Sequence, residues 1–313
     1  MNTRDFFRDW HTSREPLLRQ STFEAEEIYL TRHIIPYFEA VAPVLENITP
    51  MQVKSYTTMK LKGGRMDGKP GGLSLVSVRK HLSLMKQAFD EALIFGYIER
   101  NPAIGVHLPK RISAVAERTV FLTSEEAQKL IDGLKGDKVA PAVLLALLYG
   151  LRRSEVLGLC WDAIDFEKNT LTIRRTVVKN LTVKEYDGTK TDNSRRTFQL
   201  LPEIREVLED LQKTAPPGSN YLFCHADGSF WRPDCLTRSF QRALKRIGLP
   251  KMRFHDLRHS TASILFARGW GLEDVKNWLG HADIETTSNI YTHYSRARKV
   301  LLANSLAGMF KIG

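Results

Sequence analysis

Apolar residues recur every three or four positions along most of the chain, which is the spacing of one face of an α-helix. This pattern predicts helices at about 4–12, 21–41, 50–61, 74–95, 124–134, 138–149, 202–213 and 233–247. Start signals support several of them: Thr49 precedes a proline, Ser74 can cap a helix, and Thr123 opens a capping box with Glu126. Between the helices, residues 170–177 and 196–200 alternate apolar with polar, which predicts a small antiparallel sheet. The chain is therefore expected to be mainly α with a small antiparallel sheet.

The same pattern divides the chain into two parts. Pro109, Lys110 and Arg111 interrupt the apolar rhythm, which resumes at the capping box of Thr123. We expect a helical domain at 1–106, a linker at 107–119 and an α+β domain at 120–313. The second domain should end in a tail helix, because apolar residues 300–310 return at helical spacing after a basic start. A length of 313 residues is sufficient for two domains.

The charge of the chain favours a polyanionic partner. There are 46 basic and 35 acidic side chains, a net charge of +11. In the predicted helix at 74–95, basic residues lie on or near the polar side, where they can meet a DNA backbone or form an ordinary solvated face: these are Arg79, Lys80, His81 and Lys86.

Several classes of protein are disfavoured. The first residues mix charges with aromatics and hold no apolar secretion signal, and the longest apolar run, 139–149, is too short for a membrane span. A cytoplasmic location without membrane attachment is therefore expected. The cysteines, Cys160, Cys224 and Cys235, are too few and too scattered for a disulfide framework or a zinc site. We interpret them as buried spectator thiols.

Residues 253–294 hold the strongest chemical signal. His255 and Arg258 are three positions apart at a predicted helix start, and His281 and Tyr291 follow. Arginine matches phosphate oxygens with a planar fork of donors, histidine exchanges protons near neutral pH, and a tyrosine hydroxyl can act as a nucleophile. No carboxylate cluster accompanies them, so no metal or other cofactor is expected. The sequence H-D-L-R-H, then L-G-H, then a tyrosine ten residues beyond that histidine resembles the tyrosine recombinase (phage integrase) family.

The resemblance assigns roles to residues of this chain. In G-L-R-R-S-E it implies that Arg152 is the first catalytic arginine and Glu155 its buttress, although Arg153 leaves open which arginine points inward. In T-K-T-D-N-S-R-R it implies that Lys190 is the general acid, with Lys179 and Lys184 as rivals, and that Arg195 and Arg196 contact DNA. It also implies phosphate-binding roles for Arg258 and His281, a proton-accepting role for His255, a structural role for His259, and a nucleophile at Tyr291 with Tyr294 as the alternative.

The resemblance also implies a fold and an activity. The first domain would be a SAM-like core-binding domain, and the second would be the catalytic domain. The protein would cut and rejoin double-stranded DNA through a 3′-phosphotyrosine, as a tetramer on paired sites, to integrate or excise a mobile element with possible accessory DNA-bending or excision factors. The alternatives are a host recombinase that resolves chromosome dimers, a relaxing topoisomerase, and a non-catalytic regulator with a helix-turn-helix around Gly280. A further arm-binding domain would not fit before Asp5, so it is either naturally lacking or trimmed.

Overall fold

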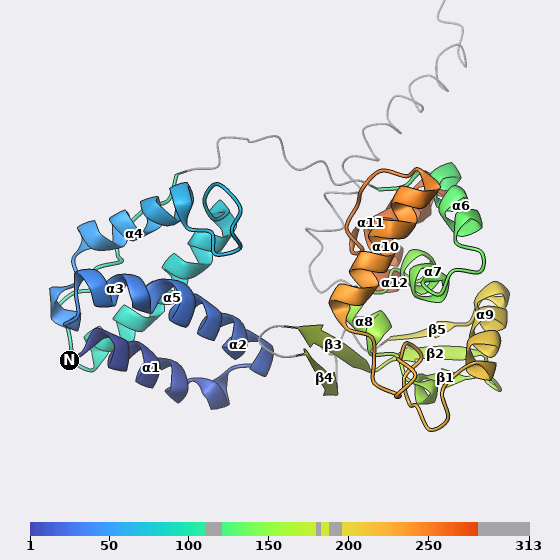
Figure 1. The fold of residues 1–313 in the computed structure, drawn as a ribbon, viewed down its shortest axis with the longest axis horizontal. Coiled ribbons are helices and arrows are strands. Elements are labelled where there is room, and N and C mark those ends of the chain that lie inside the picture. Colours follow the sequence, from blue (N-terminus) through green and yellow to red (C-terminus); the bar gives the residue numbers. More distant parts are fainter. Residues whose placement is uncertain (110–120, 180–182, 188–195, 281–313) are drawn as a thin grey trace, which may run out of the picture. The chain divides into compact units, whose positions relative to one another are not determined.

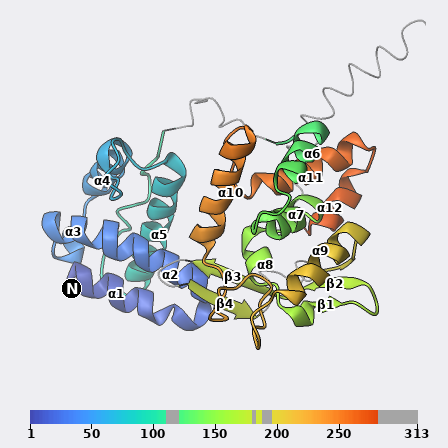
Figure 2. The ribbon, with the colours of Figure 1, turned by 45° about the vertical axis from the view of Figure 1, so that its right-hand side comes forward.

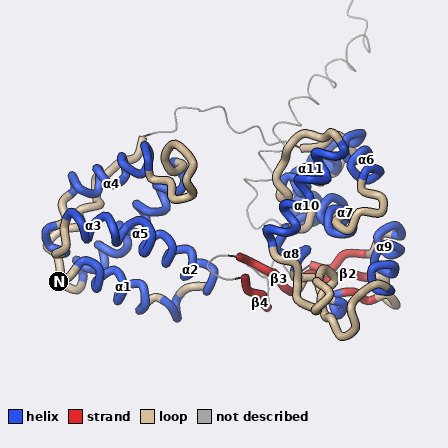
Figure 3. The backbone as a smooth tube through the Cα atoms, in the orientation of Figure 1, coloured by secondary structure: helices blue, strands red, loops and turns tan. Residues whose placement is uncertain are grey.

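A computed structural model of the chain describes residues 1–109, 121–179, 183–187 and 196–280. The chain divides into two compact units, Met1–Ala116 and Glu117–Gly313 (Figure 1). Figure 3 shows helices and loops in the described part of the first unit, whereas the second unit also contains strands. The expectation of a mainly helical protein with a small antiparallel sheet is confirmed.

The first unit is built on aromatic residues from several helices. Its helices are α1 (Thr3–Ser13), α2 (Gln20–Tyr29), α3 (Ile35–Val41), α4 (Pro50–Gly63) and α5 (Leu75–Ile94). The Phe7 ring packs against Phe38 and Phe89, and all three are fully buried. Burial of side chains of this size is the main stabilising contribution to such a unit. The caps predicted at Thr49 and Ser74 both form.

The helix predicted at 21–41, which Pro36 is expected to kink or end, is interrupted just before that proline. Leu30–Ile34 forms one π-helical turn between α2 and α3, in which the Ile35 N–H donates to the Leu30 carbonyl. Pro36 then lies in the first turn of α3, where the absence of an N–H is tolerated. The wider turn reorients the side chains that follow it.

The second unit surrounds a separate apolar core. Its helices are α6 (Ser124–Gly133), α7 (Ala140–Leu148), α8 (Arg153–Leu157), α9 (Pro202–Lys213), α10 (Pro233–Ile247), α11 (Asp256–Ala267) and α12 (Leu272–Leu279). The capping box of Thr123 is present, and α9 and α10 have the predicted bounds. Helix α11 packs against both α7 and α12 (Figure 2).

The predicted strand at 170–177 is two strands. Strand β2 (Thr170–Ile173) pairs with β1 (Ile164–Asp165) and β5 (Arg196–Gln199), forming an antiparallel sheet in the order β1-β2-β5. The chain leaves this sheet at Arg174, and β3 (Arg175–Lys179) pairs with β4 (Val183–Asp187) in a separate hairpin. The reason is local: β4 follows β3 closely enough in sequence to pair with it as a hairpin, whereas β2 pairs with a strand from further along the chain.

Candidate active site

Arg152 is held at a break between two helices. Gly150 adopts φ +65° just after α7, and Arg152 is the residue that precedes α8. Its backbone N–H donates to Glu155 Oε2 at 2.8 Å, and its Nη1 donates to Glu155 Oε1 at 2.6 Å. Arg153, in contrast, is exposed and donates to Thr237 Oγ1 at 2.8 Å. Arg152 is therefore the arginine that points into the site.

Glu155 is buried and shared between two guanidinium groups. Besides Arg152, it accepts from Arg196 Nη1 at 3.2 Å and Nη2 at 2.9 Å. Burial alone would raise the pKa of Glu155, but the charges and hydrogen bonds of Arg196 and Arg152 outweigh it and lower the pKa to about 2. The carboxylate is therefore ionised at neutral pH and orients Arg152 as the sequence suggests.

Arg258 connects the two helix ends that flank the site. It lies in the first turn of α11 and is fully buried. Its Nη1 donates to the Gly150 carbonyl at 2.6 Å, and its Nη2 donates to the Leu279 carbonyl at 2.5 Å. A guanidinium stays charged in proteins, so these bonds hold a positive charge between the start of α8 and the end of α12.

The end of α12 lies directly against Gly150 and Arg152, the residues that lead into α8. Arg152 Nη2 lies 3.4 Å from the Gly280 carbonyl, and Gly280 closes α12 with φ +65°. A Cβ atom at Gly150 would lie only 2.2 Å from Leu279 Cδ2. A glycine is thus required where these two segments meet.

His255 lies at the exposed side of the same site. It immediately precedes α11, and its ring meets that of His259 edge-on at 5.1 Å between centroids. Partial desolvation by the surrounding protein, together with the positive charges of His259, Arg258 and Arg152, lowers the pKa of His255 below its ordinary value, although the residue keeps an exposed surface. The imidazole is therefore neutral at pH 7 and able to accept a proton.

Four predicted residues, Lys190, Arg195, His281 and Tyr291, lie outside the described residues, as do the alternative Tyr294 and the tail helix. The structure thus brings together Arg152, Glu155, Arg258 and His255 from the predicted set.

The basic residues predicted on α5 separate into two groups. Arg79 and Lys80 are exposed and Lys86 is partly buried. His81, however, is wrongly placed on the polar side: it is buried, and its Nδ1 lies 2.9 Å from the Tyr56 hydroxyl. His81 follows the buried Val78 by three positions, so it shares the inward face of α5.

Arg196, which the sequence suggests as a DNA contact, lies in a nearly buried setting. Its side chain is 9% exposed and is bound to Glu155. Residues two apart on a strand share a face, and Arg196 lies two before the buried Phe198, with its guanidinium 5.4 Å from that ring. The strand alternation therefore contained a signal that Arg196 faces inward.

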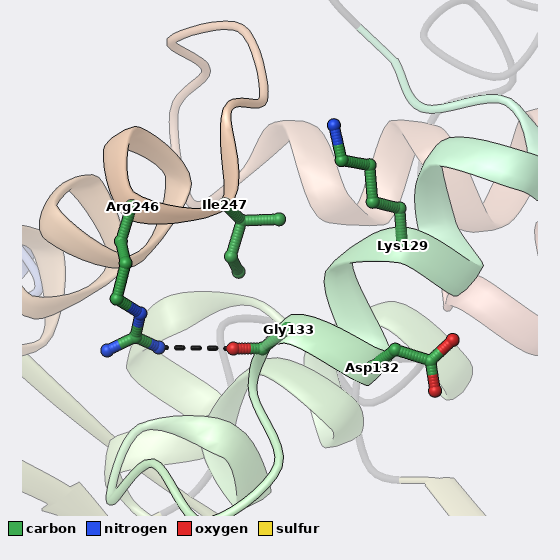
Figure 4. Close-up of a pocket in the computed structure, with 5 residues that line it drawn as sticks. All are labelled: Lys129, Asp132, Gly133, Arg246 and Ile247. Carbon is green, nitrogen blue, oxygen red and sulfur yellow. Dashed lines mark hydrogen bonds between the residues drawn. The ribbon is translucent and has the colours of Figure 1, made fainter.

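A hollow outside the candidate active site lies between α6 and α10. Its cleft is lined by Lys129, Asp132, Gly133, Arg246 and Ile247 (Figure 4). Arg246 Nη2 donates to the Gly133 carbonyl at 3.2 Å across it.

Within the described ranges, no cluster of three or more His, Cys, Asp or Glu side chains is suited to hold a metal ion. Nor does any helix in those ranges have the length and apolarity to cross a membrane.

Comparison with known proteins identifies the family of the chain. The sequence pattern of the phage integrase family matches residues 120–298. The chain belongs to the phage integrase family. It is an enzyme of the tyrosine recombinase class. A tyrosine recombinase XerC-like protein of Caldanaerobacter subterraneus subsp. tengcongensis is 31% identical over 271 residues, covering 76% of this chain and 68% of the relative.

Further relatives of the recombinase extend over more of its length. The ICEBs1 integrase of Bacillus subtilis is 25% identical over 302 residues, covering 91% of this chain and 77% of that one. Among solved structures, the Tn1549 transposon integrase in complex with a circular intermediate DNA aligns with a TM-score of 0.76 at 22% identity. That alignment covers 96% of this chain and 99% of the integrase chain, so the two share a fold in both units.

Proposed function

We propose that this recombinase cuts and rejoins double-stranded DNA at specific sites through a covalent 3′-phosphotyrosine formed by Tyr291. The observation that carries the proposal is the meeting of Arg152 and Arg258 beside a neutral His255. Two fixed cations next to a proton acceptor suit a reaction in which negative charge grows on phosphate oxygens.

The chemistry follows from these groups. The Tyr291 oxygen bonds to the scissile phosphorus while the bond to the 5′-oxygen breaks, and His255 accepts or orients the phenolic proton, since an ordinary tyrosine is mostly protonated at neutral pH. Lys190 returns a proton to the departing 5′-oxygen. Because the new ester keeps the energy of the old one, a second 5′-hydroxyl can reverse the step and rejoin the strands without a nucleotide cofactor.

Arg152, Arg258 and His281 would hold the non-bridging oxygens. The Arg152 side chain is 33% exposed and already faces solvent, whereas Arg258 is covered and donates to two backbone carbonyls. Arg258 must therefore be uncovered on its phosphate-facing side when DNA binds. His281 is joined by one peptide bond to Gly280, whose carbonyl lies beside Arg152, and this supports its place in the set.

The first unit would hold the DNA. The exposed Arg79 and Lys80 and the partly buried Lys86 lie on α5, and the whole chain carries a net charge of +11. Backbone contacts by such side chains release counterions and supply sequence-independent affinity. The transposon integrase that shares the fold was solved bound to DNA, which agrees with this role.

We further propose that the protein works in the cytoplasm as a tetramer on paired sites and integrates or excises a mobile element, with accessory DNA-bending or excision factors. The ICEBs1 integrase, which matches 91% of this chain, supports that role. The identity of 31% to a XerC-like recombinase supports a second candidate, resolution of chromosome dimers. A gene at the end of a mobile element beside an attachment site favours the first role; recombination between two copies of a chromosomal terminus site favours the second.

The test uses nicked duplexes tiled across the DNA that flanks the gene, because a nick near the cleavage point releases the 5′ end and traps the covalent adduct. The wild-type protein should form an adduct that survives denaturing electrophoresis. Tyr291→Phe should abolish it, and the matched Tyr294→Phe should retain it. An adduct that persists in Tyr291→Phe would contradict the assigned nucleophile.

A further inference from the structure

The Glu155 carboxylate lies between two arginines that come from different parts of the second unit. Arg152 precedes α8, and Arg196 begins β5, 41 residues after Glu155. Arg196 places one nitrogen on each carboxylate oxygen, at 3.2 and 2.9 Å, while Arg152 binds one oxygen through Nη1 and the other through its backbone N–H. The ion pair of Arg196 with Glu155 is almost dry, with side chains 9% and 2% exposed.

The net charge of the site depends on whether one or two arginines bind Glu155. If Glu155 faced Arg152 alone, the pair would be neutral, and a neutral pair in a dry site attracts a phosphate weakly. With Arg196 on the same carboxylate, the group of three carries a net positive charge, and Arg152, the most exposed of the three side chains, presents it to solvent. The bidentate geometry also fixes the carboxylate plane, and with it the direction of Arg152.

We propose that Arg196 is a positioning residue of the recombinase. It binds Glu155, so that Arg152 is held in place and the positive charge of Arg152 is not cancelled by Glu155 but is available to the scissile phosphate. This inference rests on the proposed function. It assigns Arg196 no contact with DNA, because its guanidinium packs over the Phe198 ring on the inward face of the sheet.

The experiment compares single-turnover cleavage of a nicked duplex at saturating protein with the dissociation constant for the same DNA. Arg196→Gln should slow cleavage by about a hundredfold, the scale of a misplaced catalytic group, and leave the dissociation constant and its salt dependence unchanged. Arg196→Lys keeps the charge but loses the two-pronged bond, so its cleavage rate should lie between those of the wild type and Arg196→Gln. Arg174→Gln is the matched control: it removes an exposed arginine that donates to the Asp162 carbonyl, and its cleavage rate should equal that of the wild type.

The decisive variant is the double change Glu155→Gln with Arg196→Gln. It removes the uncompensated carboxylate that would otherwise neutralise Arg152, so it should cleave about tenfold faster than Arg196→Gln alone. The double variant also removes both buried charges together, so it can fold even where Arg196→Gln does not. In that case, measurable cleavage by the folded double variant supports the inference, and the absence of cleavage overturns it.

The outcomes separate the two proposals. A raised dissociation constant with a salt slope lower by about one shows that Arg196 binds phosphate, and this overturns the inference while leaving the proposed function intact. A double variant that cleaves no faster than a folded Arg196→Gln also overturns it. A wild-type protein that forms no adduct with any tiled duplex overturns the proposed function itself, and the inference with it.

Discussion

Replacing Gly150 by alanine tests the contact on which the geometry of the active site depends. Gly150 has φ +65°, its carbonyl accepts a hydrogen bond from Arg258, and its Cα faces Leu279 at the end of α12. An added Cβ would lie 2.2 Å from Leu279 Cδ2, which is closer than side-chain carbons approach one another. Either the leucine side chain or the backbone of the turn must shift.

The expected destabilisation has two parts. A non-glycine residue in the left-handed region costs about 1–2 kcal/mol. Overpacking by one methyl group in a close-packed core costs about 1–3 kcal/mol. Gly150→Ala should therefore lower the free energy of unfolding of the second unit by about 2–5 kcal/mol. Gly136→Ala is the matched control, because Gly136 has φ +75° with no heavy atom within 4 Å of the added Cβ, so it should show the first part alone.

Urea unfolding followed by tryptophan fluorescence suits this comparison, because every tryptophan except Trp10 lies in the second unit. The midpoint of Gly150→Ala should fall well below that of Gly136→Ala at an unchanged slope. DNA cleavage should also be slower at a temperature where the variant is folded, since a shift of Gly150 moves the acceptor of Arg258. Equal destabilisation by the two variants would refute the close approach of Gly150 to Leu279.

Three further predictions concern other parts of the chain. Burial against Tyr56, with the nearby charges of His33 and Lys60, lowers the pKa of His81 to about 4. As the pH falls, His81 is protonated in the unfolded chain before it is protonated in the folded one, so the first unit should lose up to about 3 kcal/mol of stability between pH 6.5 and pH 4. An NMR titration of His81 with a midpoint near 6.5 would contradict this. Lys80→Gln should weaken DNA binding and reduce the salt slope by about one, whereas an unchanged slope would exclude Lys80 from the DNA contacts. Thr123→Ala should remove the bond that the Thr123 hydroxyl accepts from the Glu126 N–H, while the backbone N–H of residue 123 can still donate to the Glu126 carboxylate, and it should lower the stability of the second unit by about 1 kcal/mol in urea unfolding; no change would show that the hydroxyl cap contributes nothing.

Local signals in the sequence were sufficient for most helix boundaries. Helix α10 begins at Pro233 and ends before Gly248, which adopts φ +72°, and both residues mark those positions through their own backbone chemistry. The π-turn before Pro36 was not predicted, because a proline indicates an interruption without specifying its form. The division of the strand at Arg174 depends on which later strand each half pairs with, and alternation alone does not contain that information.

The active site likewise contains one contact that the sequence indicates and others that it does not. Arg152 and Glu155 are three positions apart at a helix start, so their ion pair forms within one helical turn and can be predicted from the motif. The bond from Arg258 to the Gly150 carbonyl spans 108 residues, and the bond from Arg196 to Glu155 spans 41. Such contacts arise from the tertiary fold, which is why the sequence indicated Arg196 as a basic residue near the site but not the carboxylate that it serves.

The central claim is that these groups act on one phosphodiester with Tyr291 as the nucleophile. The most direct measurement is mass spectrometry of the protease-digested covalent adduct, in which the nucleotide remains on its attachment residue. The account predicts a nucleotide joined through its 3′-phosphate to Tyr291. A nucleotide on Tyr294, on a serine, or joined through a 5′-phosphate would contradict it.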